Sequence, residues 1–132
     1  MDKSARVLIV DDKINVRTTI KNSLLGFVCN FFEAGCEETA LDLIENNIFD
    51  VIFLDLKIPG SSGLEIYKKA KQIQPNLGKV IVLTGYPEPE TAAEAEELGV
   101  FAYLSKASID RDIIRKTFTK ATACDTQAMP TQ

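Results

Sequence analysis

The chain has 132 residues and three cysteines, and its formal net charge at pH 7 is −4. This length fits one domain with a substantial core, and the negative charge argues against broad binding to nucleic acids or anionic membranes. No apolar run reaches the roughly 18 residues of a membrane span, and the first residues lack the apolar stretch of a signal peptide. We therefore expect a cytoplasmic domain with reduced thiols at Cys29, Cys36 and Cys124.

Histidine is absent from the sequence. Its absence excludes general acid–base catalysis by histidine, serine and cysteine nucleophiles that depend on histidine, and zinc sites with histidine ligands. Any chemistry must therefore rest on carboxylates, lysines, hydroxyl groups, backbone amides or a hard cation.

Strand and helix patterns alternate along the chain. Short runs of Val, Ile, Leu and Phe predict strands, and apolar residues at helical spacing predict helices. In the first half, the predicted elements are a strand over 6–10, a helix over 15–25, a weaker strand over 27–33 and a helix over 37–46. In the second half, they are a strand over 51–55, a helix over 64–74, a strand over 79–83, a helix over 90–98, a strand over 100–104 and a helix over 109–118. The periodicity is lost after that, so we expect one domain over residues 1–120 and a flexible tail or linker over 121–132.

This alternation predicts an α/β fold, a doubly wound parallel sheet with right-handed crossovers and helices on both faces. The strands over 6–10, 51–55 and 79–83 are nearly continuous apolar runs, which is typical of central parallel strands. The strand over 27–33 contains Asn30 and is the least apolar, so it belongs at an edge. These features predict five strands in the order 2-1-3-4-5, a (βα)5 arrangement.

Polar side chains follow the predicted strands at their carboxyl ends. Parallel strands end on one edge of a sheet, so this edge collects Asp11, Asp12, Asp55, Thr84 and Lys106. Like charges about 4 Å apart repel by roughly 4 kcal/mol at an effective dielectric constant near 20, so three carboxylates beside one lysine need a further cation. Oxygen ligands without histidine or cysteine select a hard ion, Mg²⁺ or Mn²⁺.

The same residues predict a chemistry. Asp55 is the best nucleophile candidate, because aspartate forms acyl phosphates in known enzymes. Thr84 can offer a hydroxyl group to a phosphoryl oxygen, and Lys106 can neutralise another. Simpler interpretations remain open at this point: Asp11 and Asp12 as helix caps, Thr84 as the end of a strand, and Lys106 as a surface lysine.

Several segments, in this order, carry a family resemblance. They are Leu8-Ile9-Val10-Asp11-Asp12, Leu54-Asp55-Leu56-Lys57-Ile58-Pro59-Gly60 with Gly63, Leu83-Thr84-Gly85, and Tyr103-Leu104-Ser105-Lys106. Together they resemble the receiver domain of two-component response regulators over about residues 5–119, of the kind found in chemotaxis receivers. The resemblance implies a flavodoxin-like fold, in which ligands bind where the strand order reverses.

The resemblance also implies a phospho-acceptor signalling switch rather than an enzyme, with intrinsic phosphatase activity only. Asp55 would accept a phosphoryl group from a sensor histidine kinase or a histidine phosphotransfer protein. Asp11, Asp12, Asp55 and the backbone carbonyl of Lys57 would hold Mg²⁺ or Mn²⁺.

The resemblance also implies roles in the mechanism for Thr84, Lys106 and Tyr103. Thr84 and Lys106 would bind phosphoryl oxygens, and Tyr103 would be the aromatic switch residue that turns inward as Thr84 moves. An output partner, or a second copy in a homodimer, would contact the face of the helix over 90–98, the strand over 100–104 and the helix over 109–118. The acidic run from Glu88 to Glu97 borders this face and is either a solvated surface or a partner-selecting one. The domain itself would contact neither nucleic acid nor membrane.

Two residues depart from the family pattern. Ala107 follows Lys106 where the family usually has proline, and a cis bond before a non-proline residue costs roughly 2.5–4 kcal/mol, so a trans bond is expected. Lys57 stands where the family often carries Met or another apolar residue, and it could change the lifetime of the acyl phosphate.

Three other functions remain alternatives. A pseudo-receiver would interact without phosphorylation, but it would normally lose an acidic or lysine position. A haloacid-dehalogenase-like phosphohydrolase carries a DxDxT motif, whereas Asp55 is followed by Leu56 and Lys57. A redox protein of the flavodoxin type needs a phosphate-binding loop after the first strand, and this chain has none there.

Overall fold

The structure is a computed structural model that describes residues 4–127, with side-chain environments for residues 4–123. Its centre is a five-stranded sheet in the order β2-β1-β3-β6-β7, and every neighbouring pair is parallel. The strands are β1 (Ala5–Val10), β2 (Cys29–Ala34), β3 (Val51–Asp55), β6 (Lys79–Thr84) and β7 (Ala102–Ser105). The predicted order is confirmed, because β6 and β7 are the fourth and fifth strands of this sheet.

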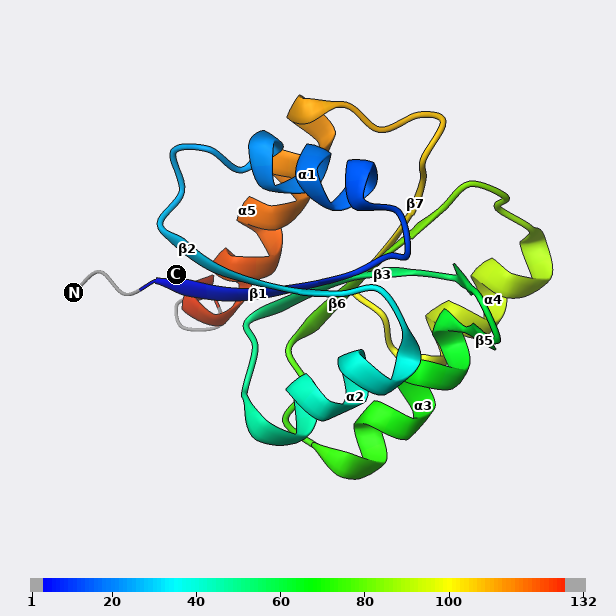
Figure 1. Ribbon diagram of the computed structural model, residues 1–132. Helices are drawn as coiled ribbons and strands as arrows, with labels where there is room; N and C mark the ends of the chain where they lie inside the picture. Colours follow the sequence, from blue (N-terminus) through cyan, green and yellow to red (C-terminus); the bar gives the residue numbers. More distant parts are fainter. Residues whose placement is uncertain (1–3, 128–132) are drawn as a thin grey trace.

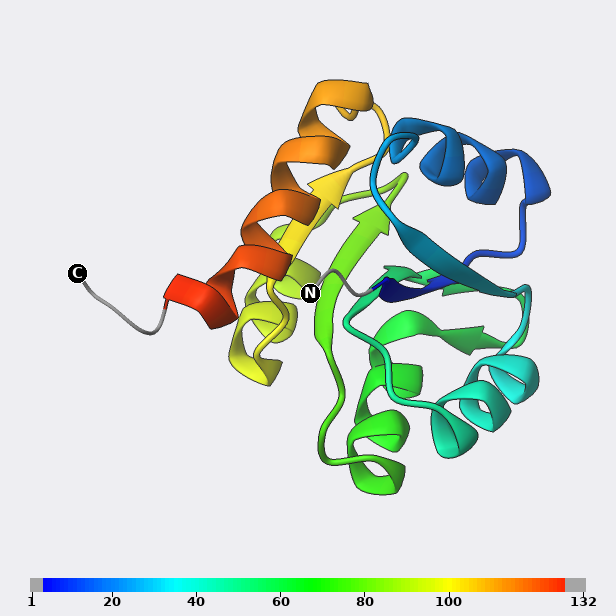
Figure 2. The same cartoon turned by 90° about the vertical axis from the view of Figure 1, so that its left-hand side faces the viewer.

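Helices cover both faces of the sheet. They are α1 (Ile14–Ser23), α2 (Glu37–Asn46), α3 (Gly63–Ile73), α4 (Pro89–Leu98) and α5 (Arg111–Gln127). Figures 1 and 2 show α1 and α5 on one face, and α2, α3 and α4 on the other. The fold is therefore the doubly wound α/β sandwich that the alternation of elements predicts.

The core consists of two apolar layers, one on each side of the sheet. Successive strand residues point to opposite faces, so Val7 and Ile9 of β1 enter the layer under α1 and α5, while Leu8 and Val10 enter the other. All five residues of β3 are buried, as expected for a central strand covered on both faces. This apolar strand delivers Asp55 to the carboxyl edge.

A short hairpin lies between β3 and α3, where the sequence predicts no strand. Residues Lys57–Ile58 (β4) and Ser61–Ser62 (β5) pair antiparallel, and Gly60 between them has a φ of +78°. Two-residue strands are too short to show a period in the sequence. Glycine adopts a positive φ without strain, so the Pro59-Gly60 turn closes the hairpin.

The end of α5 also differs from the prediction. The helix continues past residue 118 to Gln127, and Ala121 is buried against the sheet. Ile114, Phe118 and Ala121 are spaced at four and three residues, so one narrow stripe continues the helix although its neighbours are polar. The domain end at residue 120 stays a prediction, and residues 128–132 of the predicted tail lie outside the described residues.

The predicted bounds of α2 and β3 are confirmed, and the remaining bounds agree with the prediction to within two residues. The fifth strand, for example, begins at Ala102, although Val100 and Phe101 are apolar. The N–H of Phe101 donates to the carbonyl of Val80 at 2.7 Å, so this link approaches β6 before the regular pairing begins.

Two cysteines can be assessed. Cys29 and Cys36 are free thiols, as expected, while the side chain of Cys124 lies outside the described part of the chain. No helix within residues 4–127 is both long and apolar enough to cross a membrane.

Candidate functional site

The five predicted site residues come together at the carboxyl edge of the sheet. Asp11 and Asp12 follow β1, Asp55 and Thr84 end β3 and β6, and Lys106 follows β7. Asp11, Asp55 and Thr84 are only 2%, 4% and 1% exposed. Burial to this degree shows that these three side chains are not solvated surface groups.

Lys106 bridges two of the acids. Its Nζ lies 2.8 Å from Asp11 Oδ2 and 3.3 Å from Asp55 Oδ2. The N–H of Lys106 donates to the carbonyl of Thr84 at 2.8 Å, so the end of β6 holds the lysine in place. The bond between Lys106 and Ala107 is trans, as expected, and the lysine reaches both acids without a following proline.

The electrostatics of this cluster favour a further cation. Burial raises the pKa of Asp55, the negative charge of Asp11 raises it further, and Lys106 opposes both effects only in part. Burial lowers the pKa of Lys106, but Asp11 and Asp55 outweigh burial, so the net pKa is raised and the lysine stays protonated. One ammonium group therefore faces more negative charge than it can neutralise.

The acids fit a hard divalent cation. Asp11, Asp12 and Asp55 each offer a carboxylate oxygen, and these atoms lie within 4.8 Å of one another. Asp12 Oδ1 is buried and has no hydrogen-bond partner among the described residues. A buried oxygen without a partner is rare, and an oxygen-only donor set is the one Mg²⁺ prefers.

The same type of hydrogen bond, from a backbone N–H to a side chain, occurs three times at this edge. In each case the N–H of an exposed residue donates to the side chain of the site residue two positions before it, which orients that side chain. The pairs are Lys13 to Asp11 Oδ1 at 2.9 Å, Lys57 to Asp55 Oδ1 at 3.3 Å and Tyr86 to Thr84 Oγ1 at 3.1 Å.

Gly63 lets α3 begin directly against the end of β3. A Cβ at this position would lie 2.3 Å from the carbonyl oxygen of Asp55 and 2.9 Å from Leu56 Cα. No side chain fits at such distances from rigid backbone, so only glycine is compatible with this loop. This explains physically why a glycine occurs in the motif after Asp55.

Three other residues complete the surroundings of the site. The hydroxyl of Tyr103 is buried and has no hydrogen-bond partner within the described residues. Lys57 is exposed, and its Nζ lies 4.9 Å from the centre of the Tyr86 ring. Both residues line a cavity of about 200 Å³ next to Thr84. This contact could not be predicted from the sequence, because Tyr86 stands alone in a loop.

Comparison with known proteins agrees with this geometry. Residues 7–118 match the response regulator receiver domain. The chain belongs to this family. It is 35% identical over 115 residues to sporulation initiation phosphotransferase F of Bacillus subtilis (strain 168), covering 87% of this chain and 91% of that protein. This receiver domain also matches longer transcriptional regulators, but it spans only 26% of the length of ZraR from Escherichia coli (strain K12).

Solved structures have the same fold. A CheY-like receiver domain protein from Methanospirillum hungatei JF-1 is 29% identical with a TM-score of 0.82, covering 95% of this chain and 99% of that one. A response regulator from Burkholderia pseudomallei is 26% identical with a TM-score of 0.76, covering 96% of this chain and 74% of that one. The Burkholderia structure contains a phosphorylated aspartic acid, a calcium ion and citrate.

Proposed function

We propose that this receiver domain is a phospho-acceptor switch in which Asp55 takes a phosphoryl group from a phosphohistidine of a partner protein. The observation that carries the proposal is the buried Asp55 beside Lys106 and within 4.8 Å of two further carboxylates. The partner is a sensor histidine kinase or a histidine phosphotransfer protein, since the chain has no histidine to act as donor.

The transfer exchanges one bond for another. A carboxylate oxygen of Asp55 attacks the phosphorus, the new P–O bond forms as the P–N bond breaks, and the partner's imidazole keeps the electron pair. Lys106 and the hydroxyl of Thr84 bind phosphoryl oxygens, which stabilises the charge that develops in transfer. Mg²⁺ or Mn²⁺, held by Asp11, Asp12, Asp55 and the carbonyl of Lys57, would supply further neutralisation of these oxygens. The aspartyl phosphate of the Burkholderia relative supports this assignment.

The switch would act through the β6–α4 loop. Phosphorylation replaces one negative charge by about −1.5 to −2, which draws Thr84 and Lys106 toward the phosphoryl group. Thr84 Oγ1 then releases the N–H of Tyr86, and Tyr103 can move its hydroxyl, which has no hydrogen-bond partner in the described part of the chain. These changes bias two packings of the face formed by α4, β7 and α5, which an output partner reads.

The same face is suited to a second copy of the chain. The exposed residues of α4 include Glu90, Glu96 and Glu97, whereas those of α5 include Arg111, Lys116 and Lys120. In a two-fold dimer, α4 of each copy would face α5 of the other, so opposite charges would meet twice.

We propose a cytoplasmic location and no direct contact of this domain with nucleic acid or membrane.

Phosphorylation can be tested with a small donor. Incubation with Mg²⁺ and acetyl phosphate should add the mass of one phosphoryl group, and the addition should be lost in Asp55→Asn. No addition at saturating donor would favour the pseudo-receiver. Release of phosphate over many rapid turnovers would favour a phosphohydrolase instead.

A further inference from the structure

Arg17 of α1 connects two segments at the edge of the site. Its side chain is only 16% exposed. Its Nη1 donates to the backbone carbonyl of Asp11 at 2.6 Å, and its Nε donates to Glu33 Oε1 at 2.8 Å. The planar guanidinium group therefore joins the end of β2 to the loop that follows β1.

The carbonyl that Arg17 binds lies in the backbone of the clustered acids. It belongs to the peptide group between Asp11 and Asp12, two of the three clustered acids. The N–H of Asp11 donates to the carbonyl of Ala34 at 3.0 Å, so the backbone of Asp11 is held on both sides. Asp12 Oδ1 has no hydrogen bond within the described residues, and Asp12 Oδ2 has a long ion pair of 3.9 Å with the exposed Lys13, so the direction of this carboxylate depends mainly on the backbone.

Glu33 anchors the arginine. Its Oε2 accepts from Lys21 Nζ at 2.6 Å, while its Oε1 accepts from Arg17. The hydrogen bonds from Lys21 and Arg17 lower the pKa of Glu33, so it stays ionised at neutral pH. A planar guanidinium group that donates to an ionised carboxylate through Nε and to a carbonyl through Nη1 has a fixed orientation, which a lysine at residue 17 could not reproduce.

We propose that Arg17, anchored by Glu33, is a positioning residue for the divalent cation: it fixes the peptide group that aims Asp11 and Asp12 at the ion. The inference rests on the metal site of the proposed function. Hydrogen bonds that orient metal ligands typically change metal affinity by about 10- to 100-fold when they are lost.

The direction in which Arg17→Met changes the metal affinity distinguishes a positioning role from a purely electrostatic one. A positive charge beside a cation site repels the cation, so charge alone predicts that Arg17→Met tightens metal binding. Positioning predicts the opposite. Lys21→Met is the matched control, because it removes the same charge from the same helix and the same Glu33, but no contact with Asp11.

The test is a direct titration with Mn²⁺, in which electron paramagnetic resonance measures the free ion. Arg17→Met is expected to bind Mn²⁺ about tenfold more weakly than the unchanged chain, and Lys21→Met equally or slightly more tightly. Arg17→Met that binds Mn²⁺ as tightly as the unchanged chain, or more tightly, overturns the proposal. A urea unfolding curve checks that each variant is folded. If Arg17→Met is not folded, Arg17→Lys is used, for which positioning again predicts weaker binding although the charge is retained.

Labelling by acetyl phosphate adds a second measurement. Arg17→Met should need about tenfold more Mg²⁺ for half-maximal labelling, yet reach the same extent at saturation. A reduced extent at every Mg²⁺ concentration would indicate a merely structural role and contradict the proposal. Failure of the unchanged chain to label at all would overturn the proposed function, while the Mn²⁺ titration would still decide the role of Arg17.

Discussion

At the residue scale, Asp55 lies in a place that disfavours its charge. Burial, and then the charge of Asp11, raise its pKa above 3.8 in the folded state. The folded chain therefore binds a proton more strongly than the unfolded chain, and stability falls as pH rises from 3.8 to the raised folded pKa. Above that window, the ionised Asp55 destabilises the metal-free fold.

Asp55→Asn should consequently be more stable than the unchanged chain at pH 7 without Mg²⁺, by about 1 kcal/mol in the free energy of unfolding. Lys106 keeps Asp11 as a partner at 2.8 Å in this variant. Urea unfolding over a range of pH measures the difference, which should vanish below pH 3.8, where both chains are neutral at this position. Added Mg²⁺ should stabilise the unchanged chain more than the variant. Equal stability of both chains at pH 7 would contradict this account.

Some of these residues could be predicted from sequence and others could not. The positions of Asp11, Asp55 and Lys106 follow from the rule that parallel strands end on one edge, so topology was sufficient. Arg17 could not be found in this way, because a helix residue that bridges a strand end and a loop has the same periodicity as one that faces solvent. Its partner Glu33 lies 16 residues away, and only the fold brings them together.

At the scale of elements, Lys57 of β4 and Tyr86 connect the segments that follow β3 and β6. Each lies two residues after a site residue, and Lys57 Nζ is 4.9 Å from the ring centre of Tyr86. An exposed contact of this kind contributes about 0.5–1 kcal/mol. We expect it to limit the access of water to the phosphorylated Asp55.

Loss of this contact should shorten the lifetime of the aspartyl phosphate. Tyr86→Leu and Lys57→Met should each raise the rate of hydrolysis about two- to fivefold, which corresponds to the energy of the contact. Tyr86→Phe keeps the ring and serves as the control, with a lifetime near that of the unchanged chain. Decay of the phosphorylated mass over time gives the rates. If the double variant is as fast as the product of the two single effects predicts, the side chains act independently and the contact has no role.

The elements also show where sequence patterns fail. Strands of the central sheet were predictable, because burial on both faces requires long apolar runs. The β4–β5 hairpin was not, since its pairing depends on a turn at Gly60 and on Ser61, whose hydroxyl donates to Glu37 of α2. The last turns of α5 were missed for a similar reason, because Ala121 is the only buried side chain among residues 119–123, the last ones whose environment the structure describes.

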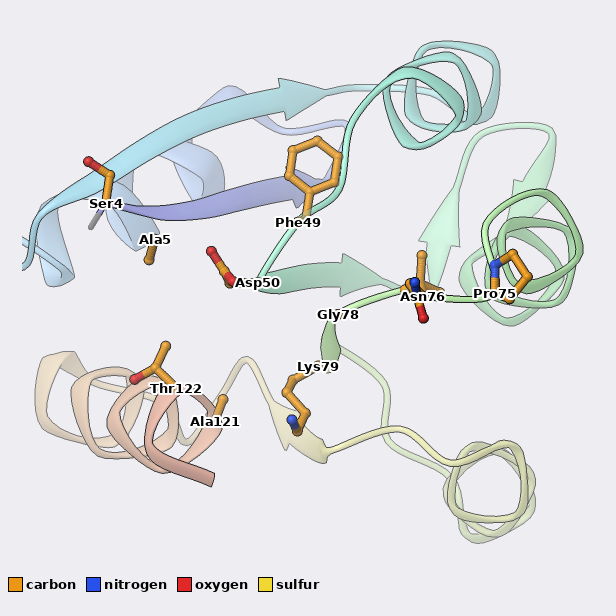
Figure 3. Close-up of a pocket in the computed structure, with 11 residues that line it drawn as sticks. Ser4, Ala5, Phe49, Asp50, Pro75, Asn76, Gly78, Lys79, Ala121 and Thr122 are labelled. Carbon is orange, nitrogen blue, oxygen red and sulfur yellow. The ribbon is translucent and has the colours of Figure 1, made fainter. Parts of the chain in front are cut away.

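At the scale of the whole molecule, the two edges of the sheet carry different features. The carboxyl edge gathers the acids, while the amino edge carries an open pocket of about 570 Å³ (Figure 3). The start of β1, the loops before β3 and β6, and the end of α5 line this pocket. Gly78 lies in it, where the entry to β6 passes directly over the entry to β3.

Gly78→Ala should therefore destabilise the entire fold without touching the site. A Cβ there would lie 2.1 Å from the carbonyl oxygen of Phe49 and 2.6 Å from that of Asp50. The carbonyl of Asp50 accepts the N–H of Lys79 at 3.0 Å, so relief of the clash would disturb the pairing of β3 with β6. We expect a loss of about 3 kcal/mol in the free energy of unfolding, measured by urea. Gly85→Ala is the matched control, because no heavy atom lies within 4 Å of its Cβ position, and it should change stability by less than about 0.5 kcal/mol. Equal unfolding midpoints for the two variants would show that the amino edge is more compliant than these distances imply.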